Sequence, residues 1–303
     1  MITIIDCDPG TDDALALLLA AASPSLGLRL VTVAGGNAGL AHTLRNARAL
    51  MALAGSDVPV VAGAERPLLG DYTAEPRVHG ADGIGGVLLP EGKPAAPGIA
   101  ADAIRDVLRG APEPVTLVGI GPATNLALAL ATEPALAARV GHIVLMSGAW
   151  AEGNITPAAE FNAWSDPEAL AMLLLCGRPV VFATLELTAQ ALVTPACIKA
   201  LRELGKGRCL AVACDIMASV PPSRRLGGSG HPLHDPCAVA WLLAPQLLTL
   251  REAHVAVECG NGPGRGRTHI DRWGRKPPNA RVLETLDAGG FFALLGEALV
   301  RLP

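Results

Sequence analysis

The residues with the most evident chemistry lie near the start of the chain, where the run DCDPGTDD at positions 6–13 holds four aspartates in eight residues. An apolar stretch of strand length precedes the run, and Pro9-Gly10 separates it from an Ala/Leu-rich stretch of helical length. The helix dipole favours acids in a first turn by about 0.3–1 kcal/mol each, which accounts for one or two of the four. Crowded carboxylates repel unless a cation neutralises them, and hard divalent ions prefer oxygen ligands. The run therefore predicts a divalent-metal site at a strand-to-helix turn.

The elements that position this run form a regular alternation of apolar segments. Short runs rich in Val, Ile and Leu alternate with longer Ala/Leu-rich runs, which is typical of a mainly parallel sheet buried on both faces. The alternation predicts a doubly wound α/β fold, with a mainly parallel central sheet, helices on both faces and a single domain over residues 1–303. The expected strands are residues 2–7, 28–34, 58–61, 115–120, 142–146 and 179–182. The expected helices are residues 12–22, 38–54, 123–131, 167–176 and 291–302.

The segments outside this alternation are a tail and two long irregular stretches. Residues 255–258, 267–271 and 281–286 are expected to form extra strands or a hairpin. Residues 63–97 and 219–234 lack periodicity and are rich in Gly and Pro. Loops of this length are commonly functional lids or disordered segments, so both stretches are candidate covers for a substrate.

The overall composition excludes several classes of partner. The chain has 303 residues, of which 50% are hydrophobic, and a net charge of −4 with no long basic run, so we expect neither nucleic-acid nor membrane-surface binding. No segment approaches the roughly 18 apolar residues of a membrane span, and no signal peptide is evident at the N-terminus. The seven cysteines are scattered without a CxxC pair, which favours free thiols in a reducing compartment. We therefore expect a cytoplasmic protein.

The opening run is compatible with a second kind of enzyme. An Asp-x-Asp pair after an apolar strand also opens the haloacid-dehalogenase-like phosphatases, which use the first Asp as nucleophile and bind Mg²⁺. That family places Thr or Val two residues after the second Asp, where this chain has Gly10. It also needs a downstream Lys, and none of the four lysines follows an obvious strand. The Mg²⁺-dependent phosphatase is therefore the weaker alternative.

The full run resembles the signature Asp-x-Asp-Pro-Gly-x-Asp-Asp of the nucleoside hydrolase family, of the inosine–uridine-preferring type. Further motifs of that family follow in the expected order as far as position 235, so the resemblance covers most of the chain. They are VAGGN at 33–37, RNA at 45–47, VHGADG at 78–83, GPATN at 121–125, GNITPAAEFN at 153–162 and HD at 234–235.

The resemblance implies a calcium site and a place for each acid of the opening run. Ca²⁺ would be bound by Asp8, Asp13, Asp235 and the backbone carbonyl of Thr124. All-oxygen ligation of this kind suits the 6–8 ligands that calcium takes. Asp6 is expected to support the other carboxylates from behind.

The implied reaction is hydrolysis of the N-glycosidic bond of a ribonucleoside to ribose and a free base. Asp8 would act as general base on a water activated by calcium, through an oxocarbenium-like transition state. Amide and carboxylate side chains would hold the sugar. Those implied for the 2′- and 3′-hydroxyls are Asp12, Asn37 and Asn162, and those for the 5′-hydroxyl are Asn154 and Glu160.

The resemblance also implies which residues surround the base. His234 matches the position proposed to protonate the leaving base in inosine–uridine-type members, where purine-specific relatives carry a Trp. His79, Met146 and Phe161 would line the rest of the pocket. Pyrimidine-preferring relatives often supply Tyr side chains just before His234, but residues 214–230 contain none and offer Arg224-Arg225 instead. The preferred base stays open on these grounds.

Two further expectations concern partners and an alternative role. The resemblance implies a homodimer or homotetramer that binds a small nucleoside. A non-catalytic ribose or nucleoside sensor on the same fold is the alternative from a different functional class. The intact set of Asp8, Asp13, Asp235 and His234 counts against a sensor, because binding alone needs no general base.

Overall fold

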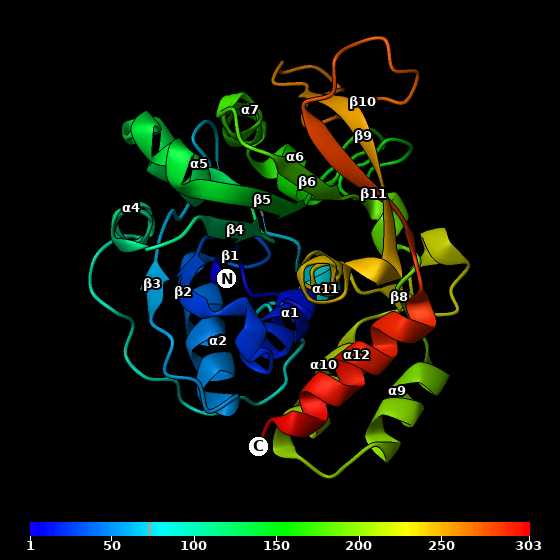
Figure 1. Cartoon of the computed structure of the whole chain (residues 1–303). Helices are drawn as coiled ribbons and strands as arrows, with labels where there is room; N and C mark the ends of the chain where they lie inside the picture. The colour runs from blue at the N-terminus through cyan, green and yellow to red at the C-terminus, as the bar shows by residue number, and fades with distance from the viewer. Residues whose placement is uncertain (72–73) are drawn as a thin grey trace.

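The computed structural model describes residues 1–71 and 74–303, and its central feature is one large twisted sheet (Figure 1). Within these residues, nine strands form the sheet in the order β10-β9-β11-β6-β5-β4-β1-β2-β3. All neighbours pair in parallel except β9, which is antiparallel to β10 and to β11. The strands of this sheet are β1 Ile2–Cys7, β2 Leu28–Val33, β3 Val60–Ala62, β4 Val115–Gly119, β5 Val140–Met146, β6 Val180–Ala183, β9 Leu248–Val257, β10 Thr268–Asp271 and β11 Ala280–Leu286.

Helices cover both faces of the sheet, as the continuous apolar strands require. Along β1, Ile4 packs into one hydrophobic cluster while Ile5 and Cys7 pack into the other, because successive side chains point to opposite faces. Figure 1 shows α4, α5 and α7 over one face, and α1, α2 and α11 over the other. The helices are α1 Thr11–Ala21, α2 Leu40–Leu53, α3 Pro76–His79, α4 Ala100–Gly110, α5 Thr124–Thr132, α6 Phe161–Ser165, α7 Pro167–Leu175, α8 Leu185–Thr188, α9 Pro195–Glu203, α10 Arg208–Ser219, α11 Pro236–Leu243 and α12 Ala288–Arg301.

The position of β1 within the sheet determines where a ligand site forms. Asp6 pairs with Thr32 of β2 on one side and with Gly119 of β4 on the other, so the carboxyl ends of three parallel strands meet at one edge. Chain order reverses at β1, since β2 follows on one side and β4 on the other. Ligands of open α/β sheets bind in the crevice at such a switch point. The acidic run that follows β1 lies there.

The predicted doubly wound α/β fold is confirmed, and most predicted elements lie within a few residues of the observed ones. The strand expected at 255–258 is wrong in extent, because β9 begins at Leu248 and ends at Val257. The irregular stretch 219–234 contains a 3₁₀ turn, Arg224–Leu226, and strand β8 His231–Pro232, which pairs with β7 Leu192–Val193. The stretch 63–97 contains α3. Its residues 72 and 73 lie outside the described part of the chain.

The remaining segments extend the α1 side of the molecule. Helices α10 and α12 pack on α1, and α9 packs on α10. All seven cysteines are free thiols, and Cys7, Cys209, Cys214 and Cys237 are buried. Within the described residues, no helix is long and apolar enough to cross a membrane.

Candidate active site

Asp8 is a fully enclosed acid of the site. It follows β1 directly, is fully buried, and accepts a hydrogen bond at Oδ2 from the backbone N–H of Asn37 at 2.7 Å. Its own backbone N–H donates to Asp13 Oδ1 at 3.1 Å. Oδ1 of Asp8 is buried and has no hydrogen-bond partner within the described chain. Burial first, and then the charge of Asp13, raises the pKa of the Asp8 carboxyl well above its usual range. An orphaned carboxylate oxygen in such a place is what a missing cation would leave.

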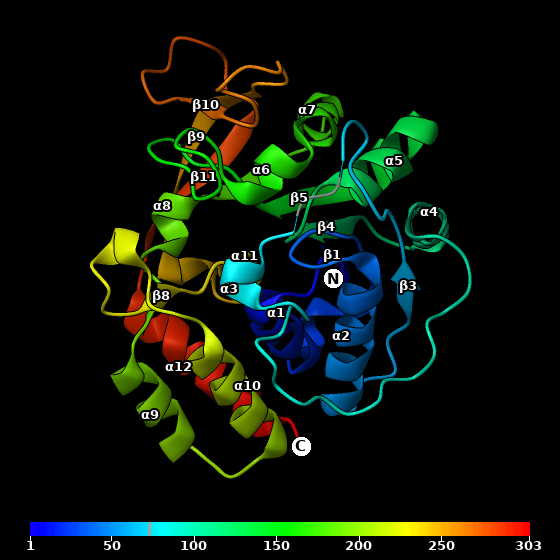
Figure 2. The same cartoon turned by 180° about the vertical axis from the view of Figure 1, so that it is seen from behind.

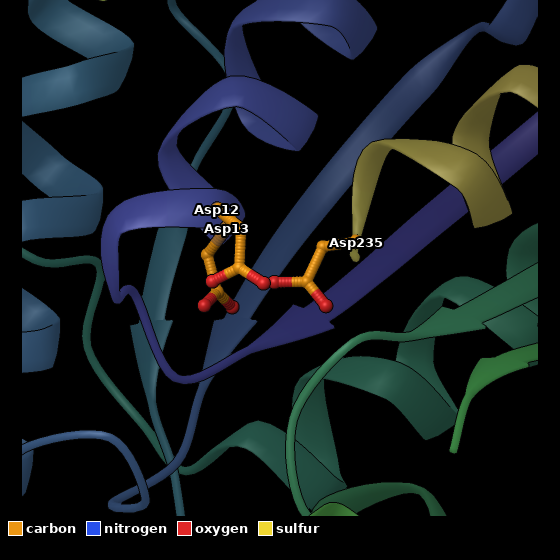
Figure 3. A group of neighbouring side chains, drawn as sticks. All are labelled: Asp12, Asp13 and Asp235. Carbon is orange, nitrogen blue, oxygen red and sulfur yellow. The ribbon is translucent and has the colours of Figure 1, made fainter. Parts of the chain in front are cut away.

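Three further carboxylates lie close to one another, and Figure 3 shows them. Asp12 and Asp13 come from the first turn of α1 and Asp235 from the residue before α11, and one oxygen of each lies within 4.8 Å of the others. The carboxylates of Asp13 and Asp235 point toward each other (Figure 3). Burial raises the pKa of Asp13 to about 7 and that of Asp235 well above its usual range. Within residues 1–71 and 74–303, no Lys or Arg forms an ion pair with any of them. The cluster could therefore hold a metal ion.

The turn that carries these acids is held in place by hydrogen bonds to the Asp13 carboxylate. Asp13 Oδ2 accepts from the backbone N–H of Gly10 at 3.0 Å and from the Asn37 side-chain amide at 3.0 Å. Asp6 lies below, where its Oδ1 accepts from the Thr32 hydroxyl and from Asn125 Nδ2 at 2.9 Å. Burial raises the pKa of Asp6 to about 7. Asp6 thus ties β1 to β2 and to α5, which fits the supporting position expected for it.

The observed cluster and the ligand set expected from sequence overlap only in part. Asp13 and Asp235 belong to both. Asp12, assigned to the sugar from sequence, lies with the other two carboxylates, and Asp8 joins them through its bond to Asp13. Thr124 begins α5 and is buried, and its hydroxyl donates to Asp166 Oδ2 at 2.6 Å. That bond orients the first turn of α5 near the acids, while the ligand role of the Thr124 carbonyl stays a prediction.

A cavity of about 390 Å³ opens above the acids, which is within the range of small-molecule sites. All eight residues expected from sequence to contact substrate line it, together with His234 and Asp235. Asp8, Asp13 and Thr124 are not among the lining residues. Figure 2 shows α3, which carries His79, on the same side of the molecule as α11 and β8. The eight are Asp12, Asn37, His79, Met146, Asn154, Glu160, Phe161 and Asn162.

The amide and acid side chains on the α6 side of the cavity are held in fixed orientations. Asn162 Nδ2 donates to the carbonyls of Ile120 and Met146, both at 3.0 Å, which leaves its Oδ1 toward other partners. Glu160 caps α6 and accepts from three backbone N–H groups, those of Gly148, Asn162 and Ala163. Asn154 Oδ1 accepts from the backbone N–H of Phe161 at 2.9 Å, so the amide NH₂ of Asn154 is its remaining donor.

Two histidines also line the cavity, of which His79 is buried and His234 is partly buried. His79 Nδ1 accepts from the backbone N–H of Thr11 at 3.1 Å, which places the ring proton on Nε2. Burial lowers the pKa of His79. His234 Nδ1 lies 2.6 Å from the Thr188 hydroxyl, and burial lowers the pKa of His234 to about 4. With Nδ1 as acceptor, a neutral His79 keeps its one ring N–H, on Nε2, for a ligand.

Two residues of the site, His231 and Thr188, had no signal in the sequence, and the basic pair at 224–225 had no assigned role. His231 lines the cavity from β8, is buried, and its Nε2 has no partner within the described chain. Arg225 also lines the cavity, whereas its neighbour Arg224 does not. Thr188 reaches His234 from a position 46 residues earlier. These residues come together only in the folded structure, so their spacing in the sequence forms no recognisable motif.

Comparisons with known proteins all point to nucleoside hydrolases. A family model described as inosine-uridine preferring nucleoside hydrolase matches residues 3–293. The pyrimidine-specific ribonucleoside hydrolase RihA of Salmonella gallinarum is 43% identical over 303 residues, covering 98% of this chain and 97% of the relative. Among solved structures, the purine-preferring ribonucleoside hydrolase from Gardnerella vaginalis superimposes with a TM-score of 0.90 at 31% identity, over 99% of this chain and 98% of that one. A plant nucleoside hydrolase, PpNRh1, gives 0.89 at 31% identity over the same shares.

Proposed function

This chain belongs to the inosine-uridine preferring nucleoside hydrolase family and is a ribonucleoside hydrolase that cleaves the N-glycosidic bond, and we propose that it acts on pyrimidine ribonucleosides with the help of Ca²⁺. The observation that carries the proposal is the buried group of acids beneath a cavity lined by every predicted substrate contact. The family match leaves no support for the phosphatase alternative. Nothing observed in the site favours a non-catalytic sensor.

The residues present fit a calcium ion. The donors are carboxylate oxygens, one buried Asp8 oxygen lacks a partner within the described chain, and no Lys or Arg of the described chain forms an ion pair with the cluster. We propose that Asp8, Asp13 and Asp235 hold the ion with the Thr124 carbonyl, and that Asp12 lies at its edge. When bound, calcium would make a nearby water more acidic and neutralise the crowded acids.

The reaction assigns one task to each group of residues. Asp8 takes the proton of the attacking water, whose oxygen bonds to the anomeric carbon C1′ of the sugar. The C1′–N bond breaks with its electron pair remaining on the base, through a transition state with oxocarbenium character. We propose that His234, which lines the cavity, faces the leaving base and donates a hydrogen bond to it from a ring N–H. The Asp8 carboxylate is shielded from solvent, and one of its oxygens has no hydrogen-bond partner within the described chain. Both features suit a general base.

Sugar recognition falls to side chains whose other hydrogen bonds are already made. Asn162 keeps Oδ1 free because its NH₂ is bonded to two carbonyls, and Asn154 keeps its NH₂ free. Asn37 donates to Asp13 and to the Asp8 carbonyl, at 3.0 and 3.2 Å, so its Oδ1 is left for a hydroxyl. We propose that Asp12, Asn37 and Asn162 hold the 2′- and 3′-hydroxyls, while Asn154 and Glu160 hold the 5′-hydroxyl. Prearranged partners of this kind lower the entropic cost of binding.

The pyrimidine preference is supported by sequence identity. The pyrimidine-specific relative is 43% identical to this chain, whereas the purine-preferring hydrolase of known structure is 31% identical. The cavity wall adds a physical argument. Among the described residues, no Trp or Tyr lines the cavity, and Phe161 is the only aromatic carbocycle there. A wide purine gains most from stacking on a large aromatic face, so this wall offers a purine little advantage.

The experiment that tests the preference is a release assay with uridine, cytidine, inosine and guanosine at equal concentration with Ca²⁺. We expect kcat/KM for uridine or cytidine to exceed that for either purine nucleoside by at least tenfold. A purine nucleoside as the best substrate would contradict the preference but not the hydrolase assignment.

Three further proposals concern the protein as a whole. We propose a single functional domain over residues 1–303, because both helical layers pack on one sheet. We propose a homodimer or homotetramer, supported by the family resemblance and measurable by light scattering. The seven free thiols support a reducing, cytoplasmic location.

A further inference from the structure

The segment before His234, where pyrimidine-preferring relatives often carry Tyr, forms a closed loop at the cavity in this chain. Val220, Pro221, Pro222 and Ser223 line the cavity from this loop. The loop is closed at its base, because the backbone N–H of Ser223 donates to the Gly230 carbonyl at 2.7 Å. Arg225 lies on the short turn within it and also lines the cavity.

Arg225 connects this loop with the opposite wall of the cavity. Its Nη1 donates to the backbone carbonyls of Glu152 and Gly153, at 3.0 and 3.3 Å, across 72 residues of sequence. Those carbonyls are firmly placed: a Cβ on Gly153 would stand 2.1 Å from the Ala159 carbonyl oxygen, so the loop there is tightly folded. One guanidinium nitrogen, Nη1, is thus hydrogen-bonded to the protein, and these bonds orient the planar group at the cavity.

The other two guanidinium nitrogens, Nε and Nη2, are available to a ligand. No carboxylate of the described chain forms an ion pair with Arg225, and its Nε and Nη2 make no hydrogen bond there. Arginine presents five N–H donors in a rigid fork and stays charged. A charged, oriented donor at the wall of a cavity is suited to a carbonyl oxygen of the ligand, because charge-assisted hydrogen bonds are about twice as strong as neutral ones.

We propose that Arg225 is a specificity-determining residue that donates from Nε or Nη2 to a carbonyl oxygen of the leaving pyrimidine. The inference rests on the proposed function. When the C1′–N1 bond breaks, its electron pair stays on N1 and the negative charge spreads onto the adjacent carbonyl oxygen of the base. A cationic donor at that oxygen binds the transition state more tightly than the ground state. Arg225 thereby takes over base recognition in a segment without tyrosine.

The test compares Arg225→Ala and Arg225→Lys with Arg224→Ala as matched control, since both arginines are exposed on the same turn but only Arg225 lines the cavity. Each variant is assayed with uridine and with p-nitrophenyl β-D-ribofuranoside, which has the same ribose as uridine but a p-nitrophenolate leaving group without a base carbonyl. We expect Arg225→Ala to lower kcat/KM for uridine about 10²-fold, Arg225→Lys to restore part of it, and the nitrophenyl riboside to change less than threefold. Arg224→Ala is expected to match wild type on both.

Two outcomes would overturn the inference. Equal losses on both substrates would mean that Arg225 only closes the loop, and wild-type kinetics of Arg225→Ala on uridine would mean that it does not touch the base. Failure of the wild-type protein to cleave any pyrimidine nucleoside would instead contradict the proposed preference, which the same assays show separately.

Discussion

Gly36 lies so close to Asp8 that a Cβ built on the glycine would stand 2.0 Å from Asp8 Oδ2. Gly121 approaches from the other side, where a Cβ would stand 2.5 Å from Oδ1. Asp8 is therefore enclosed between the loops that follow β2 and β4. These two backbones therefore restrict the position of the Asp8 carboxylate, which we propose to be the general base.

The first prediction follows from this enclosure. Gly36→Ala must displace the Asp8 carboxylate, since overpacking a buried site costs about 1–3 kcal/mol and a misplacement of about 1 Å can lower a rate about 10²-fold. We expect kcat for uridine to fall at least that far. Gly39→Ala is the control, because a Cβ there meets nothing within 4 Å. Equal activities of the two variants would show that Asp8 has freedom the structure does not allow.

The second prediction concerns the metal-free protein and its dependence on pH. The folded pKa of Asp13 is raised to about 7, whereas the unfolded value is near 3.8. Its stabilising contribution is therefore present below pH 3.8 and is lost as the pH rises through about 7. With a chelator, we expect a lower Tm at pH 8 than at pH 5.5, and calcium should restore more stability at pH 8. Asp13→Asn should show a weaker pH dependence in chelator. A chelated wild-type protein that gains stability between pH 5.5 and 8 would contradict this sign.

The third prediction uses the sugar. Asp12, Asn37 and Asn162 lie in the cavity with oxygens that the protein itself leaves unpaired or charged. Removing a substrate hydroxyl would leave such groups unsatisfied, and sites of this kind reject the deoxy analogue by about 10⁴-fold. We expect 2′-deoxyuridine to be cleaved about that much more slowly than uridine, measured as uracil release at low substrate. Similar rates would refute the assignment of these residues to the ribose.

The parts of this structure that sequence could predict are those with local signals. The parallel strands are continuous apolar runs, and the acids are crowded into one turn. The prediction for strand β9 was wrong in extent because residues 249–252 are exposed and mostly polar, and they are held by antiparallel pairing with β11 rather than by an apolar run. The helices α9 and α10 were not predicted, although Thr194 caps α9 with a bond to the Cys197 N–H at 3.1 Å. The pairing of Arg225 with Glu152 and of Thr188 with His234 depends on tertiary folding, so no local pattern encodes it.

The central claim is that Asp8 is the base in a calcium-dependent ribonucleoside hydrolysis, and Asp8→Asn tests it most directly. Uracil release from uridine should be measured at saturating Ca²⁺, with bound calcium counted in the same samples. The prediction is that the variant, folded and still holding calcium through Asp13 and Asp235, loses at least about 10³-fold in kcat, at the scale of general-base catalysis. A calcium-loaded Asp8→Asn protein that hydrolyses uridine within tenfold of wild type would contradict the account.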